Sequence, residues 1–171
     1  MAMKLYSTNN KENIVELKEA ILKGLASDGG LFMLKEIPEL SGELKGTLPE
    51  IAFEVSKCLL QNEVPDDKLR EIINDAINFD APLVKIAEGV SALELFHGPT
   101  MAFKDFGARF LSRITSYFIK GEGREITVLV ATSGDTGSAV AHGFLNVPGI
   151  KVVILYPSGK VSPLQEKQLT G

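Results

Sequence analysis

A lysine, Lys104, lies between two phenylalanines, Phe103 and Phe106, in the segment HGPTMAFKDFGARF (residues 97–110). A lysine amine is a nucleophile only while it is neutral. Burial among apolar groups and a place at the start of a helix both favour the neutral form. Such an amine forms a Schiff base with an aldehyde, either a substrate or pyridoxal phosphate. The alternative is a surface lysine whose stem covers apolar side chains while its head stays in water.

A second segment that can do chemistry is ATSGDTGSAV (residues 131–140), which follows an apolar run and opens a helical pattern. Its glycines allow a sharp turn and a close approach of the backbone to a ligand. The start of a helix presents free N–H groups to an anion, and hydroxyl groups add to them. The alternative is an ordinary N-capped turn between a strand and a helix. The residues concerned are Thr132, Ser133, Gly134, Thr136, Gly137 and Ser138.

Helical patterns dominate the first eighty residues. Apolar residues recur there at spacings of three and four, which predicts three helices. The segments are 13–25, 47–60 and 65–79. Thr47, followed three positions later by Glu50, predicts a capping box at the start of the second helix. Cys58 falls on the apolar stripe of the same helix, which favours a buried filler over a reactive thiol.

The second half alternates short apolar runs with helical patterns. Strands are predicted at 81–86, 91–96, 126–131 and 151–156, and helices at 104–119 and from Ser162 onward. The last two strands are continuous apolar runs, as in parallel strands buried on both faces. We therefore predict an α/β fold in which a helical N-terminal domain (1–80) precedes an open parallel sheet with helices on both faces (81–171). Within the helix at 104–119, Asp105 and Arg109 are one turn apart and are expected to pair on its exposed side.

Composition and motifs exclude several functions. The net charge is −4 and the basic residues are scattered, so neither nucleic acid nor an anionic membrane surface is expected as a partner. No apolar run is long enough to span a membrane. A lone cysteine excludes an intramolecular disulfide, two histidines are too few for a histidine-rich metal site, and the cytoplasm is the expected compartment.

Three nucleotide-binding or protease motifs bear on the function. The dinucleotide pattern G-x-G-x-x-G and the P-loop are both absent. The run DTGS (residues 135–138) matches the aspartic-protease motif, but such proteases need two carboxylates that share a proton. This chain has one copy, and a helical pattern follows it where a protease would need a strand. We therefore set the protease interpretation aside.

Together the motifs resemble the threonine synthase family over nearly all of the chain. HGPTMAFKDFGARF resembles the family's cofactor-lysine segment and ATSGDTGSA its substrate loop. GLASDGGLFM near the start and LYPSGKVSPLQEKQ near the end also resemble family signatures, and the four segments follow the family's order. One departure is FMLKEIP, where the family usually has its proline sooner.

This resemblance implies a pyridoxal-phosphate enzyme of fold type II, the tryptophan-synthase-β-like fold, that converts O-phosphohomoserine and water into threonine and phosphate. It implies that Lys104 holds the cofactor and later serves as acid and base, with Phe103 and Asp135 also at the cofactor. The substrate carboxylate would lie on the loop that contains Thr132, Ser133, Gly134, Asp135, Thr136 and Gly137. His97 and Thr100 would shape the lysine's loop, and Lys160 is a phosphate contact or an exposed lysine.

The family's phosphate-cradling loop and its partner for the pyridine nitrogen come later in the chain than Gly171. The sequence therefore resembles an N-terminal fragment whose C-terminal part is missing, and we expect it to be inactive alone. An interrupted sheet would expose apolar strands, so self-association is also expected. The alternative function is a non-catalytic α/β module that binds anions or a partner.

Overall fold

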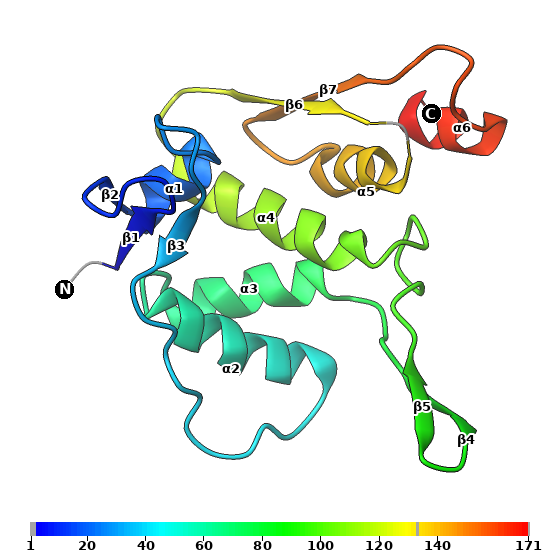
Figure 1. Cartoon of the computed structure of the whole chain (residues 1–171), viewed down its shortest axis with the longest axis horizontal. Coiled ribbons are helices and arrows are strands. Elements are labelled where there is room, and N and C mark those ends of the chain that lie inside the picture. Colours follow the sequence, from blue (N-terminus) through cyan, green and yellow to red (C-terminus); the bar gives the residue numbers. More distant parts are fainter. Residues whose placement is uncertain (1–2, 133, 171) are drawn as a thin grey trace. The chain divides into compact units, whose positions relative to one another are not determined.

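The computed structural model describes residues 3–132 and 134–170, which fall into two compact units (Figure 1). Unit 1 covers residues 1–74 and unit 2 covers residues 75–171. The predicted boundary between 80 and 81 remains a proposal. Helix α3 (Asp66–Ala76) contributes its last two residues to unit 2.

Unit 1 contains a small antiparallel sheet, which the sequence analysis did not predict. Its strand order is β2-β1-β3, with β1 at Lys4–Ser7, β2 at Ile14–Glu16 and β3 at Phe32–Leu34. The helix predicted over 13–25 was therefore wrong at its start, because α1 begins only at Leu17 and ends at Lys23. Residues 14–16 pair with β1 and alternate between exposed and buried, which is the period of a strand.

The loop after α1 is fixed by one carboxylate. Asp28 Oδ1 accepts hydrogen bonds from the Ser7 hydroxyl at 2.6 Å and from Gly30 N–H at 3.0 Å. These bonds, the hydroxyl of Ser7 first, lower the pKa of Asp28 below its usual value. A Cβ at Gly30 would lie 2.1 Å from Ser7 Oγ and 2.8 Å from the backbone nitrogen of Asn9, so only glycine fits. This packing accounts for the SDGG run.

Two helices complete unit 1. The second helix, α2, spans Leu48–Leu60, and Glu50 accepts from the Thr47 N–H at 2.7 Å, as the capping-box pattern predicted. The ring of Phe53 is buried and lies 3.6 Å from the guanidinium carbon of Arg70 on α3. The core of this unit takes Phe53 and Leu60 from α2 and Leu69, Ile72 and Ile73 from α3. Its most buried large side chains include Phe53, Val64, Leu69 and Ile73.

Unit 2 begins with an antiparallel hairpin and continues as alternating helices and strands (Figure 1). The hairpin pairs β4 (Leu83–Ala87) with β5 (Val90–Leu93). The remaining elements are α4 (Lys104–Ile119), β6 (Ile126–Ala131), α5 (Asp135–Phe144), β7 (Ile150–Leu155) and α6 (Pro163–Thr170). Strands β6 and β7 are parallel, as predicted.

The two parallel strands are covered on one face only. Residues on one face are buried or half-buried, whereas Leu129, Val153 and Leu155 on the other face are 64%, 43% and 53% exposed. The prediction of strands buried on both faces was therefore wrong for this chain. The continuous apolar run reflects an apolar face that no described element covers.

Helices α4 and α5 contact each other through small residues. A Cβ at Gly143 would lie 3.1 Å from the carbonyl carbon and the Cβ of Ala108. The buried Ser112 hydroxyl donates to the Gly143 carbonyl at 2.6 Å.

No helix of the described residues is long and apolar enough to cross a membrane. The same residues contain no cluster of histidine, cysteine or carboxylate side chains that could hold a metal ion.

Candidate functional site

Lys104 is the first residue of α4, where the sequence predicted a helix to begin. Its side chain is half-buried, so it is neither in the core nor fully in water. The ammonium lies 4.3 Å from the centre of the Phe103 ring, and that ring is 60% exposed. The preceding loop reaches this point through a turn in which Met101 N–H donates to the Gly98 carbonyl at 3.0 Å, with Met101 at φ 56°. A tight turn thus presents the lysine.

The amine of Lys104 is uncommitted. Within the part of the chain that the structure describes, no carboxylate or carbonyl pairs with it, and its recorded contact is the face of Phe103. A half-buried primary amine at a helix start therefore fits covalent attachment of an aldehyde cofactor.

Asp105 and Arg109 do not form the exposed pair that the spacing predicted, because both side chains are buried, at 0% and 7% exposure. Asp105 accepts from the Thr100 N–H at 2.9 Å and the Thr100 hydroxyl at 2.6 Å. Arg109 instead donates to the carbonyls of Ala76 at 2.8 Å and Asp75 at 2.5 Å. Burial, followed by the neighbouring Arg113 cation, lowers the pKa of Arg109.

The loop between β6 and α5 is organised by Thr132. Its hydroxyl oxygen accepts from Gly134 N–H at 3.2 Å and from Gly137 N–H at 3.1 Å. The hydroxyl is thus engaged with its own loop, and the predicted role of Thr132 at a substrate remains a proposal. Ser133, also predicted at the substrate, lies outside the described residues.

The first turn of α5 is open to solvent on one side. Asp135 and Thr136 are exposed, and Asp135 Oδ1 lies 3.5 Å from the Gln165 amide nitrogen, a weak contact. Ser138 is buried, and its hydroxyl has no hydrogen-bond partner among the described residues. Asp135 and Thr136 are therefore accessible at the helix start, and the anion site expected there stays a prediction.

Gly137 is needed for packing within the loop. A Cβ there would lie 2.0 Å from Thr132 Cγ2 and 3.0 Å from Leu169 Cδ2 on α6. Any other residue would push the loop away from both neighbours. The sequence predicted a role for Gly137 in the approach of a ligand, and the structure gives this glycine a role in packing as well.

In Figure 1 the start of α4 and the start of α5 lie at the same end of unit 2. This is also the end at which β6 and β7 terminate, where ligands bind in open α/β sheets. The arrangement places an uncommitted amine and a helix start that can receive an anion on one side of the unit. A ligand suits such a site if it carries an aldehyde that the amine can attack and an acidic group that the helix start can bind.

Two other predicted residues have defined surroundings. His97 Nε2 lies 2.7 Å from Glu94 Oε2, and its ring stacks on Phe96 at a centroid distance of 4.7 Å. Sequence reasoning missed Glu94, whose position three residues before His97 was the available signal. Lys160 is exposed, in agreement with the second of its two interpretations.

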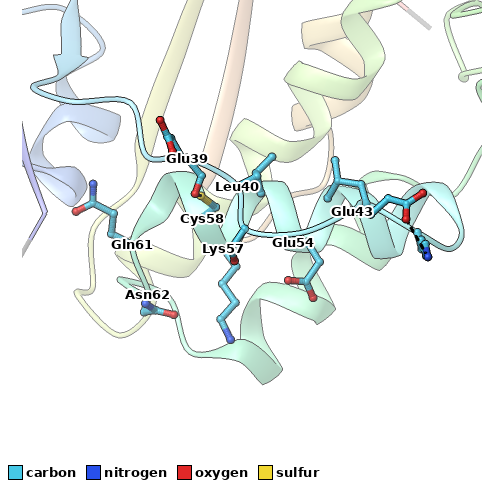
Figure 2. A pocket seen from close by; sticks show the side chains of 11 residues that line it. Glu39, Leu40, Glu43, Glu54, Lys57, Cys58, Gln61 and Asn62 are labelled. Carbon is cyan, nitrogen blue, oxygen red and sulfur yellow. Dashed lines mark hydrogen bonds and ion pairs between the residues drawn. The ribbon is translucent and has the colours of Figure 1, made fainter.

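A cavity of about 550 Å³ lies in unit 1, between the irregular segment 35–47 and α2 (Figure 2). None of the predicted site residues lines it. Cys58, predicted as a buried filler, lines this cavity and is half-buried, with its sulfur 3.6 Å from the Glu39 carbonyl. The cavity walls mix carboxylates, lysines and leucines, a composition that points to no particular ligand.

Comparisons with known proteins agree with the motifs. The family model described as "Threonine synthase N terminus" matches residues 4–77. Threonine synthase from Haemophilus influenzae is 46% identical over 96% of this chain, and that from Escherichia coli 42% identical over 96%. The chain spans 39% of the length of each of these relatives.

Solved structures give the same answer for the fold. The crystal structure of Escherichia coli threonine synthase has a TM-score of 0.87 and 40% identity, covering 98% of this chain and 40% of that one. A pyridoxal-phosphate-bound threonine synthase from Brucella melitensis has a TM-score of 0.90 and 36% identity, covering 98% of this chain and 38% of that one. Over nearly all of its length the chain is therefore similar to threonine synthases, it spans 39% of the length of the two relatives above, and it shares the fold type II architecture of the two solved structures.

Proposed function

We propose that this chain carries the cofactor lysine and the substrate loop of a threonine synthase. The reaction is the conversion of O-phospho-L-homoserine and water into L-threonine and phosphate, with pyridoxal phosphate as cofactor. The supporting observation is the half-buried, uncommitted amine of Lys104 at the end of unit 2 where α5 also begins. The enzyme class is a carbon–oxygen lyase acting on a phosphate ester, and we assign it to the cytoplasm.

The proposed roles are those that the resemblance to threonine synthases implies. Lys104 attaches the cofactor, and its Nζ then carries protons between neighbouring carbons of the substrate. Pyridoxal phosphate supplies the electron sink that lets protons leave the α and β carbons before phosphate departs from the γ carbon. Phe103, whose ring is exposed, and Asp135 would be the other residues of this chain that hold the cofactor. The loop at 132–137 would receive the substrate carboxylate through those N–H groups and hydroxyls that do not bond within the loop, as the Thr132 hydroxyl does.

The chain covers 39% of the relatives, so the complete site requires more than the described residues. We infer that the groups that hold the cofactor phosphate and pyridine nitrogen are supplied by the part of the family sequence beyond this chain. The exposed apolar face of β6 and β7 supports this, because a parallel sheet in an α/β protein is normally covered on both faces. We therefore expect the chain alone to release no phosphate from O-phosphohomoserine.

The proposal is tested by incubating the chain with pyridoxal phosphate, reducing with borohydride, and locating the label by peptide mass spectrometry. We expect the label on Lys104, with a near-visible absorbance that Lys104→Ala abolishes. The matched control is Lys35→Ala, which removes an exposed lysine from unit 1 and leaves the absorbance unchanged. Label spread over the lysines in proportion to exposure would favour a non-catalytic anion-binding module. Phosphate release that Lys104→Ala does not reduce would contradict the assigned role of Lys104.

A further inference from the structure

Asp105 is a fully buried carboxylate that the proposed chemistry does not use. It follows Lys104 directly in the first turn of α4, and its side chain is 0% exposed. Both of its oxygens are engaged by one residue, with Oδ2 accepting from the Thr100 N–H at 2.9 Å and Oδ1 from the Thr100 hydroxyl at 2.6 Å. Burying a carboxylate is costly, so its presence here needs a compensating role.

The loop before Lys104 is wrapped around this carboxylate. A Cβ at Gly98 would lie 2.4 Å from Asp105 Oδ2 and 2.8 Å from Asp105 Cβ, so the backbone passes against the side chain. Asp105 N–H donates to the Ala102 carbonyl at 3.0 Å, which closes the loop from the other side. The carboxylate thus ties residues 98–102 to the first turn of the helix.

The charge of Asp105 is balanced locally. Its position in the first turn of α4 places it at the positive end of the helix dipole. The buried guanidinium of Arg109, one turn further along, interacts electrostatically with it. The Asp105 carboxylate accepts both hydrogen bonds from Thr100, which a neutral amide of the same shape cannot do because one of its two polar atoms is a donor.

We propose that Asp105 is a positioning residue for Lys104. By holding Thr100 and the backbone at Gly98, it fixes the loop that enters α4 and thereby the direction in which the Lys104 amine projects. Asparagine in its place would offer one acceptor and one donor, and the donor would oppose a donor of Thr100. The inference rests on the proposed role of Lys104 but concerns a different residue, whose hydrogen bonds can be tested separately.

The test uses the 171-residue chain and the variants Asp105→Asn, Thr100→Val and Thr100→Ser. Labelling of Lys104 by pyridoxal phosphate and borohydride is measured against labelling of Lys35 in the same sample. We expect Asp105→Asn and Thr100→Val each to reduce relative Lys104 labelling about fivefold, the factor that corresponds to one net hydrogen bond. Thr100→Ser keeps both donors and should restore labelling to the level of the unsubstituted chain. A general loss of stability would not produce this rescue.

Amide hydrogen exchange supplies a second measurement that needs no cofactor. In Asp105→Asn the amides of residues 98–104 should exchange faster, while those of α5 beyond its first turn keep their rates. If the unsubstituted chain does not label at Lys104, the proposed function fails for this chain, and exchange alone then decides the role of Asp105. Unchanged exchange, or equal labelling in Asp105→Asn and the unsubstituted chain, overturns the inference.

If Asp105→Asn does not fold, Thr100→Val and Thr100→Ser give the same decision with the carboxylate retained.

Discussion

The guanidinium of Arg109 closes the carboxyl end of α3, whose last carbonyl groups have no partner inside the helix. The Arg109 side chain is 7% exposed, and its bond to the Ala76 carbonyl is buried while its bond to the Asp75 carbonyl is partly buried. We expect Arg109→Lys to lower the free energy of unfolding by about 1.5–3 kcal/mol. A lysine ammonium cannot reproduce the two N–H donors that the planar guanidinium directs at the two carbonyls, so a buried carbonyl loses its hydrogen bond. Urea denaturation followed by circular dichroism measures this change.

The control is Arg124→Lys, which alters an arginine of the same unit whose partner is the exposed Glu122 carboxylate. It should change the free energy of unfolding by no more than about 0.5 kcal/mol. Equal effects of the two substitutions would show that the buried bonds contribute nothing particular.

Around Asp105 and Arg109 the sequence predicts the helix but not which of its side chains are buried. The position of Lys104 at a helix start could be predicted, because Phe103, Phe106 and Phe110 recur at helical spacing. The burial of Asp105 and Arg109 could not, because a spacing of four residues places two side chains on one face of a helix without saying whether that face meets solvent or protein. Their partners, Thr100 and the end of α3, are set by tertiary packing.

At the scale of elements, the contact between α4 and α5 depends on the absence of a side chain at Gly143. The Cβ of an alanine would lie 3.1 Å from two atoms of Ala108 and 3.2 Å from the Arg109 nitrogen, and two of these three atoms are backbone. We expect Gly143→Ala to lower the free energy of unfolding by about 1–3 kcal/mol, the usual cost of overpacking.

Gly107 on α4 is the matched control for Gly143. It is also a helical glycine, but nothing lies within 4 Å of the position of its Cβ. Gly107→Ala should therefore raise the free energy of unfolding by about 0.5–1 kcal/mol, because alanine is the better helix former. Thermal and urea denaturation of the two variants should move in opposite directions. Movement in the same direction would contradict the close contact assigned to Gly143.

Elements with strong periodicity could be predicted, and weakly patterned ones could not. The bounds of α4 and β6 match the sequence prediction, since each carries a long, uniform pattern. Strand β2 was missed because its three residues precede a real helix, and its pairing with β1 cannot be read from local sequence. The loop at 132–137 could be identified as a candidate site, but the engagement of Thr132 with its own backbone could not.

At the scale of the whole molecule, the exposed face of β6 and β7 is the feature with the clearest physical consequence. Leu129 and Val153 are directly paired across the two strands and are 64% and 43% exposed. Leu155 adds to the same apolar surface. The relatives, of whose length this chain spans 39%, have further sequence that can cover it. Without such a cover, apolar area leaves water only by association between chains.

We expect the 171-residue chain to self-associate at concentrations of tens of micromolar, with the β6–β7 face in the contact. Substituting Leu129→Glu and Val153→Lys together places opposite charges at a cross-strand pair, which keeps the strands paired but makes the face polar. Sedimentation velocity should then show a shift toward the monomer. The control pair Ile37→Glu and Leu40→Lys removes two exposed apolar residues of unit 1 and should leave the association unchanged. A monomeric unsubstituted chain would contradict the prediction. An equal effect of the control pair would show that the contact between chains does not depend on the β6–β7 face.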